Sequence, residues 1–176
     1  LVGRNDWSST LPKNNQSYFY PAVSTSLVFT DALGISSDIF SLGKIRASYA
    51  QVGNDADPYS LQDVFYLGDP FNGKFTLTTP NTRNNPNLKP ERSAETELGT
   101  ELQFFKGRIG LDFTWYNKLS SDMIANVPMP SSSGYTSQYL NFGEMRNKGI
   151  EIGLNLTPLN MANGLKWNIY TSFTKN

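Results

Sequence analysis

The sequence contains neither cysteine nor histidine among its 176 residues. These absences exclude disulfides, thiol nucleophiles, cysteine or histidine zinc sites and any catalysis that uses an imidazole base. Charge of one sign is not in excess either, because 15 lysine and arginine residues balance 15 aspartate and glutamate residues. No overall basic field is present to attract nucleic acid, so we expect no nucleic-acid partner.

Long apolar runs and helical periodicity are also missing. No stretch approaches the roughly 18 consecutive apolar residues that cross a bilayer as a helix. The chain opens on Leu1 without a signal peptide and stops inside a strand-like alternation, so we expect a piece of a longer polypeptide. Aromatic residues, by contrast, reach 13%, and they suit both strands and interfaces between water and apolar matter.

The dominant pattern is an alternation of apolar and polar residues with a period of two. In residues 95–104, Leu98 and Leu102 alternate with Glu97 and Glu101, which places apolar and charged side chains on opposite faces of a strand. Similar alternation predicts about six long strands. They lie at residues 16–29, 43–53, 95–104, 108–117, 148–158 and 165–173.

The connections between these strands differ in length. Residues 105–108 and 159–164 are short and residues 31–42 are moderate, whereas 54–92 and 128–147 are long and rich in Gly, Pro, Asn and Ser. In an antiparallel meander successive turns lie at opposite ends, so we expect the long loops at one end and the short turns at the other. We also expect a hairpin inside the first loop that turns at "DPFNGK".

This asymmetry is typical of a transmembrane β-barrel, with apolar residues facing lipid and polar residues facing a lumen. A soluble β-sandwich has strands that alternate for the same reason, so the pattern alone leaves both architectures open. About six strands are fewer than the roughly eight of the smallest membrane barrels, and open edges are not tolerated in lipid. The barrel interpretation therefore requires further chain.

One polar stretch resembles the loop-to-strand segment of TonB-dependent outer-membrane receptors: "NPNLKPERSAETELG" (85–99). Further blocks in the same order narrow the resemblance to the SusC/RagA-like branch. They are "RNDWSSTLPKNNQSYFYPAVSTSLVF" (4–29), "KIRASYAQVGN" (44–54), "GLDFTWYNKLSSDMI" (110–124) and "NFGEMRNKGIEIGLNLTP" (141–158). The resemblance covers nearly the whole chain apart from the variable loops.

The resemblance implies an all-β, antiparallel up-and-down segment, covering residues 1–176, of a 22-stranded barrel in a Bacteroidetes-type outer membrane. It implies nutrient import, of glycans or peptides, with a SusD-like lipoprotein lid and energy from the TonB complex. No enzyme activity, cofactor or metal is implied. The plug domain, TonB box and terminal aromatic residue of the family are not in this sequence. A soluble carbohydrate-binding β-protein is the alternative.

Two groups of carboxylates are candidate sites. Glu95, Glu97 and Glu101 share one strand face, and residues two apart lie about 7 Å from each other, which is within the range of an inverting glycosidase pair. No flanking motif supports catalysis, so we interpret them as the wet face of the sheet. Asp55 and Asp57 have a spacing common in calcium loops, but further oxygen ligands are missing, which favours a polar turn.

Aromatic residues in the long loops are the predicted contacts for a substrate or a partner protein, because aromatic rings stack on sugars and pack against proteins. They are Tyr59, Phe65, Tyr66, Phe71, Phe75, Tyr135, Tyr139 and Phe142. The alternative is that they form a small core of the loops themselves. Trp115, Tyr116 and Trp167 are predicted near strand ends, as in an interfacial aromatic girdle.

Overall fold

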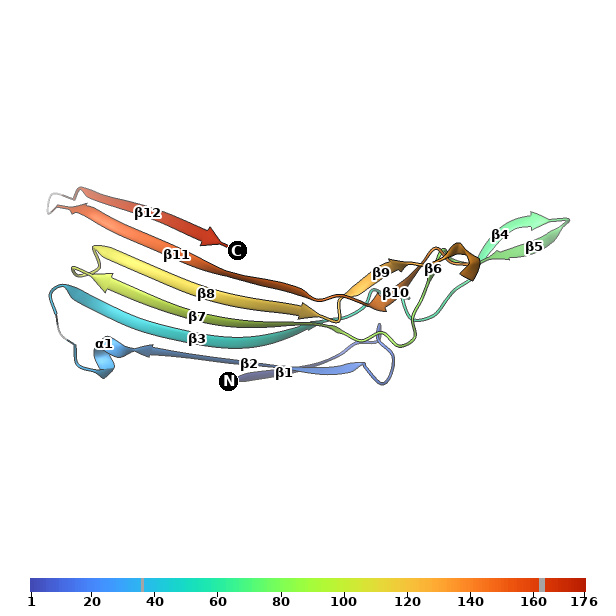
Figure 1. Cartoon of the computed structure of the whole chain (residues 1–176), viewed down its shortest axis with the longest axis horizontal. Helices are drawn as coiled ribbons and strands as arrows, with labels where there is room; N and C mark the ends of the chain where they lie inside the picture. The colour runs from blue at the N-terminus through green and yellow to red at the C-terminus, as the bar shows by residue number, and fades with distance from the viewer. Residues whose placement is uncertain (36, 162–163) are drawn as a thin grey trace.

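The computed structural model, which describes residues 1–35, 37–161 and 164–176, is dominated by one seven-stranded antiparallel sheet (Figure 1). Its order, β1-β2-β3-β7-β8-β11-β12, follows the chain, so the predicted antiparallel meander is confirmed. Its strands are β1 (Val2–Trp7), β2 (Ser17–Val28), β3 (Phe40–Asn54), β7 (Glu91–Phe104), β8 (Ile109–Ser121), β11 (Met145–Asn160) and β12 (Lys166–Lys175).

The six predicted long strands are confirmed, and the sheet contains one further, short strand, β1, that was not predicted. Its sequence, VGRNDW, has no regular apolar face, and nothing local marks it as a strand. It forms because residues 2–7 pair antiparallel with residues 17–22 of β2. Pairing with β2, rather than the residue pattern of β1 itself, therefore determines that β1 is a strand.

Two smaller sheets lie beyond one end of the long sheet (Figure 1). The first has the order β6-β10-β9, with β6 (Thr82–Arg83) from one long connection and β9 (Ile124–Pro128) and β10 (Ser137–Asn141) from the other. The second is a hairpin of β4 (Tyr66–Phe71) and β5 (Lys74–Thr78). It turns at Asn72 and Gly73, whose φ angles are 50° and 73°, so the predicted hairpin is confirmed.

The two long connections lie at the same end of the long sheet, as predicted. They are residues 55–90 and 122–144, and with the shorter connection 8–16 at that end we call them the loop cluster. The remaining connections, which include the single helical turn α1 (Phe29–Ala32) and the tight turn at 105–108, lie at the other end. A further 3-10 turn, η1 (Ser131–Ser133), lies in the loop cluster. No helix of the described residues is long and apolar enough to cross a membrane.

The best-buried apolar side chains lie in the loop cluster and not in the long sheet. Leu11, Ala56 and Leu88 are 1%, 5% and 0% exposed, and we call them the buried cluster. Ile124 and Tyr139 pack against it from the third connection, so all three connections meet at one small core. In the described parts of the chain no second sheet packs on either face of the long sheet, so the sandwich alternative is wrong.

We predict that Leu88→Ala loosens the loop cluster by about 2–5 kcal/mol, the usual cost of a cavity at a fully buried leucine. The measurement is native-state proteolysis of the loops in the intact protein, which reports the free energy of local opening. Leu67→Ala is the matched control, because Leu67 is 75% exposed on the hairpin. Equal protease sensitivity of the two variants would show that the buried cluster does not hold the loops together.

Candidate functional site

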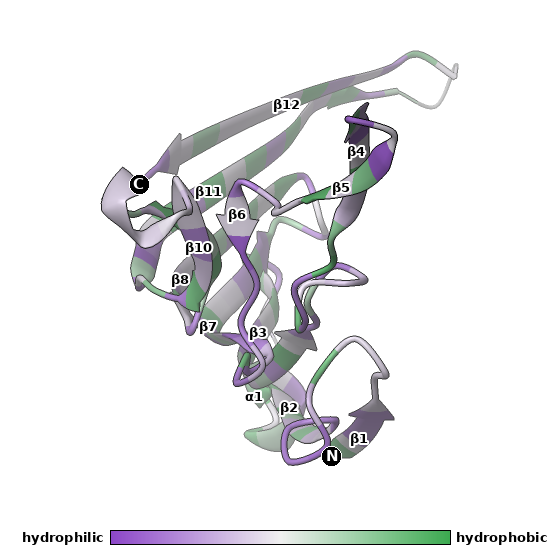
Figure 2. Cartoon of the chain, turned by 90° about the vertical axis from the view of Figure 1, so that its right-hand side faces the viewer, coloured by the Kyte–Doolittle hydropathy of each residue, from purple (hydrophilic) through white to green (hydrophobic). Residues whose placement is uncertain are grey.

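In its central strands β7, β8 and β11, the long sheet carries its leucine and isoleucine side chains on one face. Cross-strand pairing places Leu98 beside Trp115 and Trp115 beside Ile150. The next positions along the strands repeat this row with Thr100, Phe113 and Ile152, and then with Leu102, Leu111 and Leu154. Leu98 remains 49% exposed, because nothing in the described chain covers this face. Figure 2 shows the alternation of hydrophobic and hydrophilic residues along the strands.

The apolar face is a band that ends before the strands do. Beyond the row of Trp115, the next row towards the loop cluster consists of Thr96, Asn117 and Lys148. Strands β7, β8 and β11 continue for several more residues past this row. Beyond the apolar band the strands therefore continue towards the loop cluster with a face that is mostly polar apart from Ala94 and Leu119.

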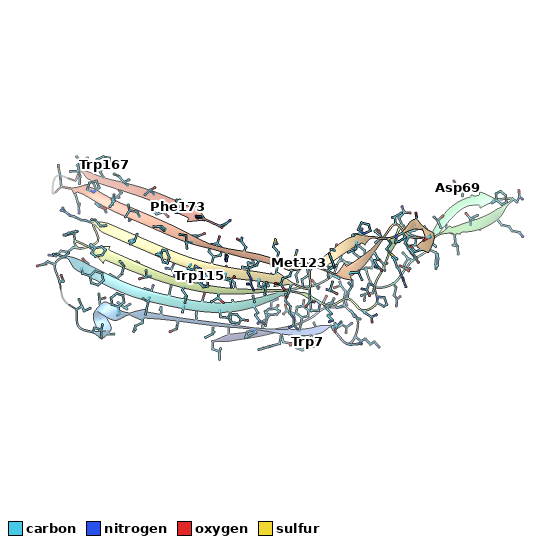
Figure 3. The ribbon with its side chains drawn as sticks, in the orientation of Figure 1. Trp7, Asp69, Trp115, Met123, Trp167 and Phe173 are labelled. Atoms are coloured by element: carbon cyan, nitrogen blue, oxygen red, sulfur yellow. The ribbon has the colours of Figure 1, made fainter. Side chains whose placement is uncertain are left out.

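The predicted aromatic girdle is partly corrected. Trp167 lies at the start of β12, near a strand end, whereas Trp115 lies midway along the sheet (Figure 3). Trp115 nevertheless lies in the last apolar row, at the edge of the apolar band. This edge is midway along the strands, since the strands continue beyond the band. Tyr116 is on the opposite, polar face, and its hydroxyl donates to Asn176, so its girdle assignment is wrong.

The polar face is tied together by a bidentate ion pair that skips one strand. Arg46 on β3 reaches across β7 to Asp112 on β8, with Nη1 to Oδ2 and Nη2 to Oδ1 distances of 2.9 and 3.0 Å, and it also donates to Thr114 at 2.5 Å. Gly99 of β7 lies under the guanidinium, where an added Cβ would be 2.5 Å from Nε. Glycine is therefore required for this crossing.

The three candidate catalytic carboxylates, Glu95, Glu97 and Glu101, belong to the same polar face. Glu97 accepts a hydrogen bond from Ser48 at 3.2 Å, and Glu101 accepts one from Gln103 at 3.1 Å and lies 3.8 Å from Lys44 Nζ. Glu95 is opposite Lys118 in the strand register. These carboxylates face cross-strand partners along an open surface rather than one another across a cleft.

The sequence blocks that precede the strands form the interior of the loop cluster. Asn15 Nδ2 donates to the carbonyl of Leu88 at 2.9 Å. Asn141 exchanges hydrogen bonds with the backbone of Lys89, at 2.9 Å from N–H to Oδ1 and 2.8 Å from Nδ2 to O. The leucines of "STLP" and "NPNLKP" are the ones that become buried together. Packing between loops that are distant in the sequence is therefore the structural role of these two blocks.

Asp55 and Asp57, the candidate calcium ligands, have different surroundings. The Asp55 carboxylate accepts hydrogen bonds from the hydroxyls of Ser8 and Thr10, while Asp57 is exposed. In the described residues no group of three or more acidic side chains could hold a metal ion. Hydrogen bonds from Ser8, and secondarily from Thr10, hold the pKa of the Asp55 carboxyl below its ordinary value of 3.8. Asp55 therefore anchors the first connection to the second.

The eight loop aromatics divide into two groups. Six are exposed: Tyr59, Phe65, Tyr66, Phe71, Phe75 and Phe142. The other two belong to the loop structure, because Tyr135 donates its hydroxyl to Asp63 at 2.9 Å and Tyr139 packs against the buried cluster. The bond to Asp63 raises the pKa of the Tyr135 phenol.

The hairpin presents an apolar face that the sequence interpretation did not include in full. Leu67 and Leu77 are paired across β4 and β5, and both are exposed. Phe75, two residues before Leu77 on β5, shares their face by strand alternation, and Phe65 immediately precedes β4. The spacing of phenylalanine and leucine by two residues, at 65 and 67 and at 75 and 77, was the signal that could have identified the two leucines. The hairpin extends away from the remainder of the loop cluster (Figures 1 and 3).

Comparison with known proteins gives a consistent result. The family profile described as "TonB dependent receptor-like, beta-barrel" matches residues 3–176. TonB-dependent receptor P26 of Formosa agariphila is 32% identical over 93% of this chain, and receptor P3 of the same organism is 33% identical over 100% of it. The chain spans only 17% and 18% of the lengths of those two receptors.

A solved structure of the RagAB peptide transporter contains a chain with the same fold. It superposes with a TM-score of 0.84 at 29% sequence identity, covering 97% of this chain and 18% of the other. The likeness extends over the long sheet and the loop cluster together, since nearly all residues are covered.

We predict that Gly99→Ala and Asp112→Asn destabilise the barrel wall to a similar extent, because each disrupts the contact of Arg46 with Asp112. Both side chains of the pair are partly exposed, at 37% and 45%, so the expected loss is about 1 kcal/mol each. The measurement is the temperature at which the full-length receptor loses its folded mobility in gel electrophoresis. If the double variant loses the sum of both effects, the two residues act independently and the assignment is wrong.

We also predict that Asp55 stabilises the loop cluster only above acidic pH. Because its pKa is lowered in the folded chain, the contribution is complete above pH 3.8 and is lost as the pH falls below that value. Asp55→Asn should raise amide hydrogen exchange in the loops about fivefold at pH 6, the effect of losing one hydrogen bond. The difference from the parent should disappear at strongly acidic pH, after correction for intrinsic exchange rates; a difference independent of pH would contradict the role of the carboxylate.

Proposed function

The chain belongs to the TonB-dependent receptor family of β-barrels, and from that premise we propose that it serves in nutrient import together with a SusD-like lipoprotein. The family lies in the outer membrane of Gram-negative bacteria and consists of transporters rather than enzymes. The observation that carries the proposal is the pairing of a barrel wall with a structured loop cluster that displays exposed aromatic side chains.

The two faces of the sheet fit this function. Outer-membrane barrels have long loops outside the cell and short turns in the periplasm, with apolar residues towards lipid. The face of Leu98, Phe113 and Ile152 is therefore the lipid face, and the face of Arg46 and Asp112 lines the lumen. The loop cluster then stands at the outer opening, where a nutrient arrives.

The substrate class and the partner are parts of the proposal. Glycans and peptides are the two classes that the resemblance implies, and likeness to a chain of the RagAB peptide transporter favours peptides. The exposed aromatics of the hairpin, Phe71 and Phe75 among them, are suited to pack against a lipoprotein lid or a substrate. Energy would come from the TonB complex through parts of the receptor outside this chain.

The mechanism assigned to this chain is positional and involves no covalent step. The polar face offers water, carboxylates and hydroxyls along the path of the substrate, so the wall is wetted and does not retain apolar groups. The Arg46–Asp112 pair links three adjacent strands on the lumen face. The loop cluster holds its aromatic side chains on small sheets rather than on irregular chain, which reduces the entropy lost on binding.

The test uses the full-length receptor expressed in its own outer membrane with its lipoprotein partner. Replacement of Phe71 and Phe75 by alanine should weaken binding of the lipoprotein or of the labelled peptide at least about fivefold, the effect of removing aromatic contact residues. Phe173→Ala is the matched control, because Phe173 is 55% exposed but lies on the lipid face. The two binding partners are measured separately, by co-purification and by peptide titration.

The outcomes separate the parts of the proposal. Weakened co-purification alone assigns the hairpin to the lid, and weakened peptide binding alone assigns it to the substrate. If the double variant retains both at the parental level, the hairpin has no role in either contact. If deletion of the whole receptor leaves growth on peptides and on glycans unchanged, the proposed import function itself is wrong.

A further inference from the structure

Four cations gather on the lipid face of the sheet, in the last row of the apolar band and beyond it towards the loop cluster. They are Arg92 of β7, Arg146 and Lys148 of β11 and Lys175 of β12. Each lies on the same strand face as the apolar residues of its strand. All four are exposed. We call these four residues the basic patch.

The patch begins where the apolar band ends. Lys148 comes two residues before Ile150 on the same strand face, and Lys175 is paired directly with Ile150 across the strands. Residues two apart on a strand lie about 7 Å from each other. The headgroup layer on each side of the hydrocarbon is about 5–7 Å thick, so Lys148 and Lys175 reach that layer.

The acidic side chains of these strands lie on the opposite face. The lumen face of β7, β8 and β11 holds Glu91, Glu95, Glu97, Glu101, Asp112 and Glu151, together with one lysine, Lys118. The nearest acidic residues outside the strands are Glu144, which precedes β11, and Asp122, which follows β8. Within the described ranges, none of the four cations of the basic patch takes part in an ion pair. Their charge is therefore available to an external anion.

Neighbouring groups extend the patch with hydrogen-bond donors. Asn117 is paired with Lys148 in the strand register and faces the same side. A hollow of 420 Å³ opens beside Arg92 and is also lined by Lys89 and Asn14, together with one acidic residue, Asp122. Trp115 and Tyr49 lie at the boundary of the apolar band, where aromatic residues meet the headgroups.

We propose that the basic patch binds the phosphate groups of an anionic lipid in the outer leaflet. Lysine and arginine form charge-assisted hydrogen bonds with phosphate oxygens, and their long stems can lie along the apolar band while the charges reach the headgroups. Phosphate on an acyl-chain anchor matches the juxtaposition of cations with the apolar rows of Ile150 and Phe173. The site lies on the outside of the wall, so it goes beyond the proposed import function.

The test uses the full-length receptor purified in a neutral detergent, with bisphosphorylated lipid A as the probe and native mass spectrometry as the measurement. Lys148→Gln should weaken lipid A binding about fivefold, and Arg146→Gln with Lys148→Gln about 25-fold, from the usual contribution of each basic residue near an anionic headgroup. Lys118→Gln is the matched control. Lys118 lies one register position from Lys148 on the same two strands, but on the lumen face.

Two further probes identify the source of the phosphate. Dephosphorylated lipid A should bind weakly and equally to the parent and to all variants, and inorganic phosphate should neither stabilise the receptor nor displace lipid A at millimolar concentration. The proposal is overturned if the double variant binds lipid A like the parent, or if Lys118→Gln weakens it as much as Lys148→Gln. It is also overturned if dephosphorylated lipid A binds as well as the phosphorylated form, or if inorganic phosphate competes.

Discussion

The structure depends on one constraint: a single-layer sheet has a different solvent on each face. A sheet in a globular protein buries at least one face against another layer, but the long sheet of this chain has neither face covered within its described residues. Its backbone hydrogen bonds are satisfied between strands, so only the side chains decide what each face contacts. Leucine, isoleucine and phenylalanine on one side and carboxylates on the other are the direct consequence.

This constraint explains why the chain has so small a core. The wall gains its apolar stabilisation from lipid rather than from internal packing, and Leu98 and Phe173 stay about half exposed in the chain itself, at 49% and 55%. The loop cluster, which lies beyond the end of the long sheet, has a small core of its own. Leu11 and Leu88 provide it from connections far apart in the sequence. The lumen face is stabilised differently, through polar contacts such as the pair of Arg46 with Asp112.

The sequence predicted the features that repeat locally. Alternation within each strand gave the long sheet apart from β1, and the sequence Asn72-Gly73 marked the hairpin turn. Features that depend on pairing between distant residues were not predictable. The Arg46–Asp112 contact joins residues 66 positions apart, and the role of Gly99 appears only when β3, β7 and β8 are aligned. Strand β1 was missed because its own residues lack an apolar face.

The loop cluster shows the same division. The eight aromatics were selected by residue type, but their exposure depends on which of them pack with residues of another connection, as Tyr139 does. Trp115 is near the end of the strand predicted at residues 108–117, but β8 continues to Ser121, so Trp115 lies midway along it. The basic patch likewise emerges only from the register, since its four members come from three strands.

The most direct test of the account is a scan of single spin labels along residues 148–156 of β11 in the full-length receptor in lipid bilayers. The account predicts that labels at Ile150, Ile152 and Leu154 contact oxygen dissolved in the lipid, while labels at Glu151, Gly153 and Asn155 contact a water-soluble nickel complex. Accessibility should therefore alternate with a period of two. Uniform accessibility to the nickel complex, or alternation of the opposite phase, would contradict the assignment of the two faces.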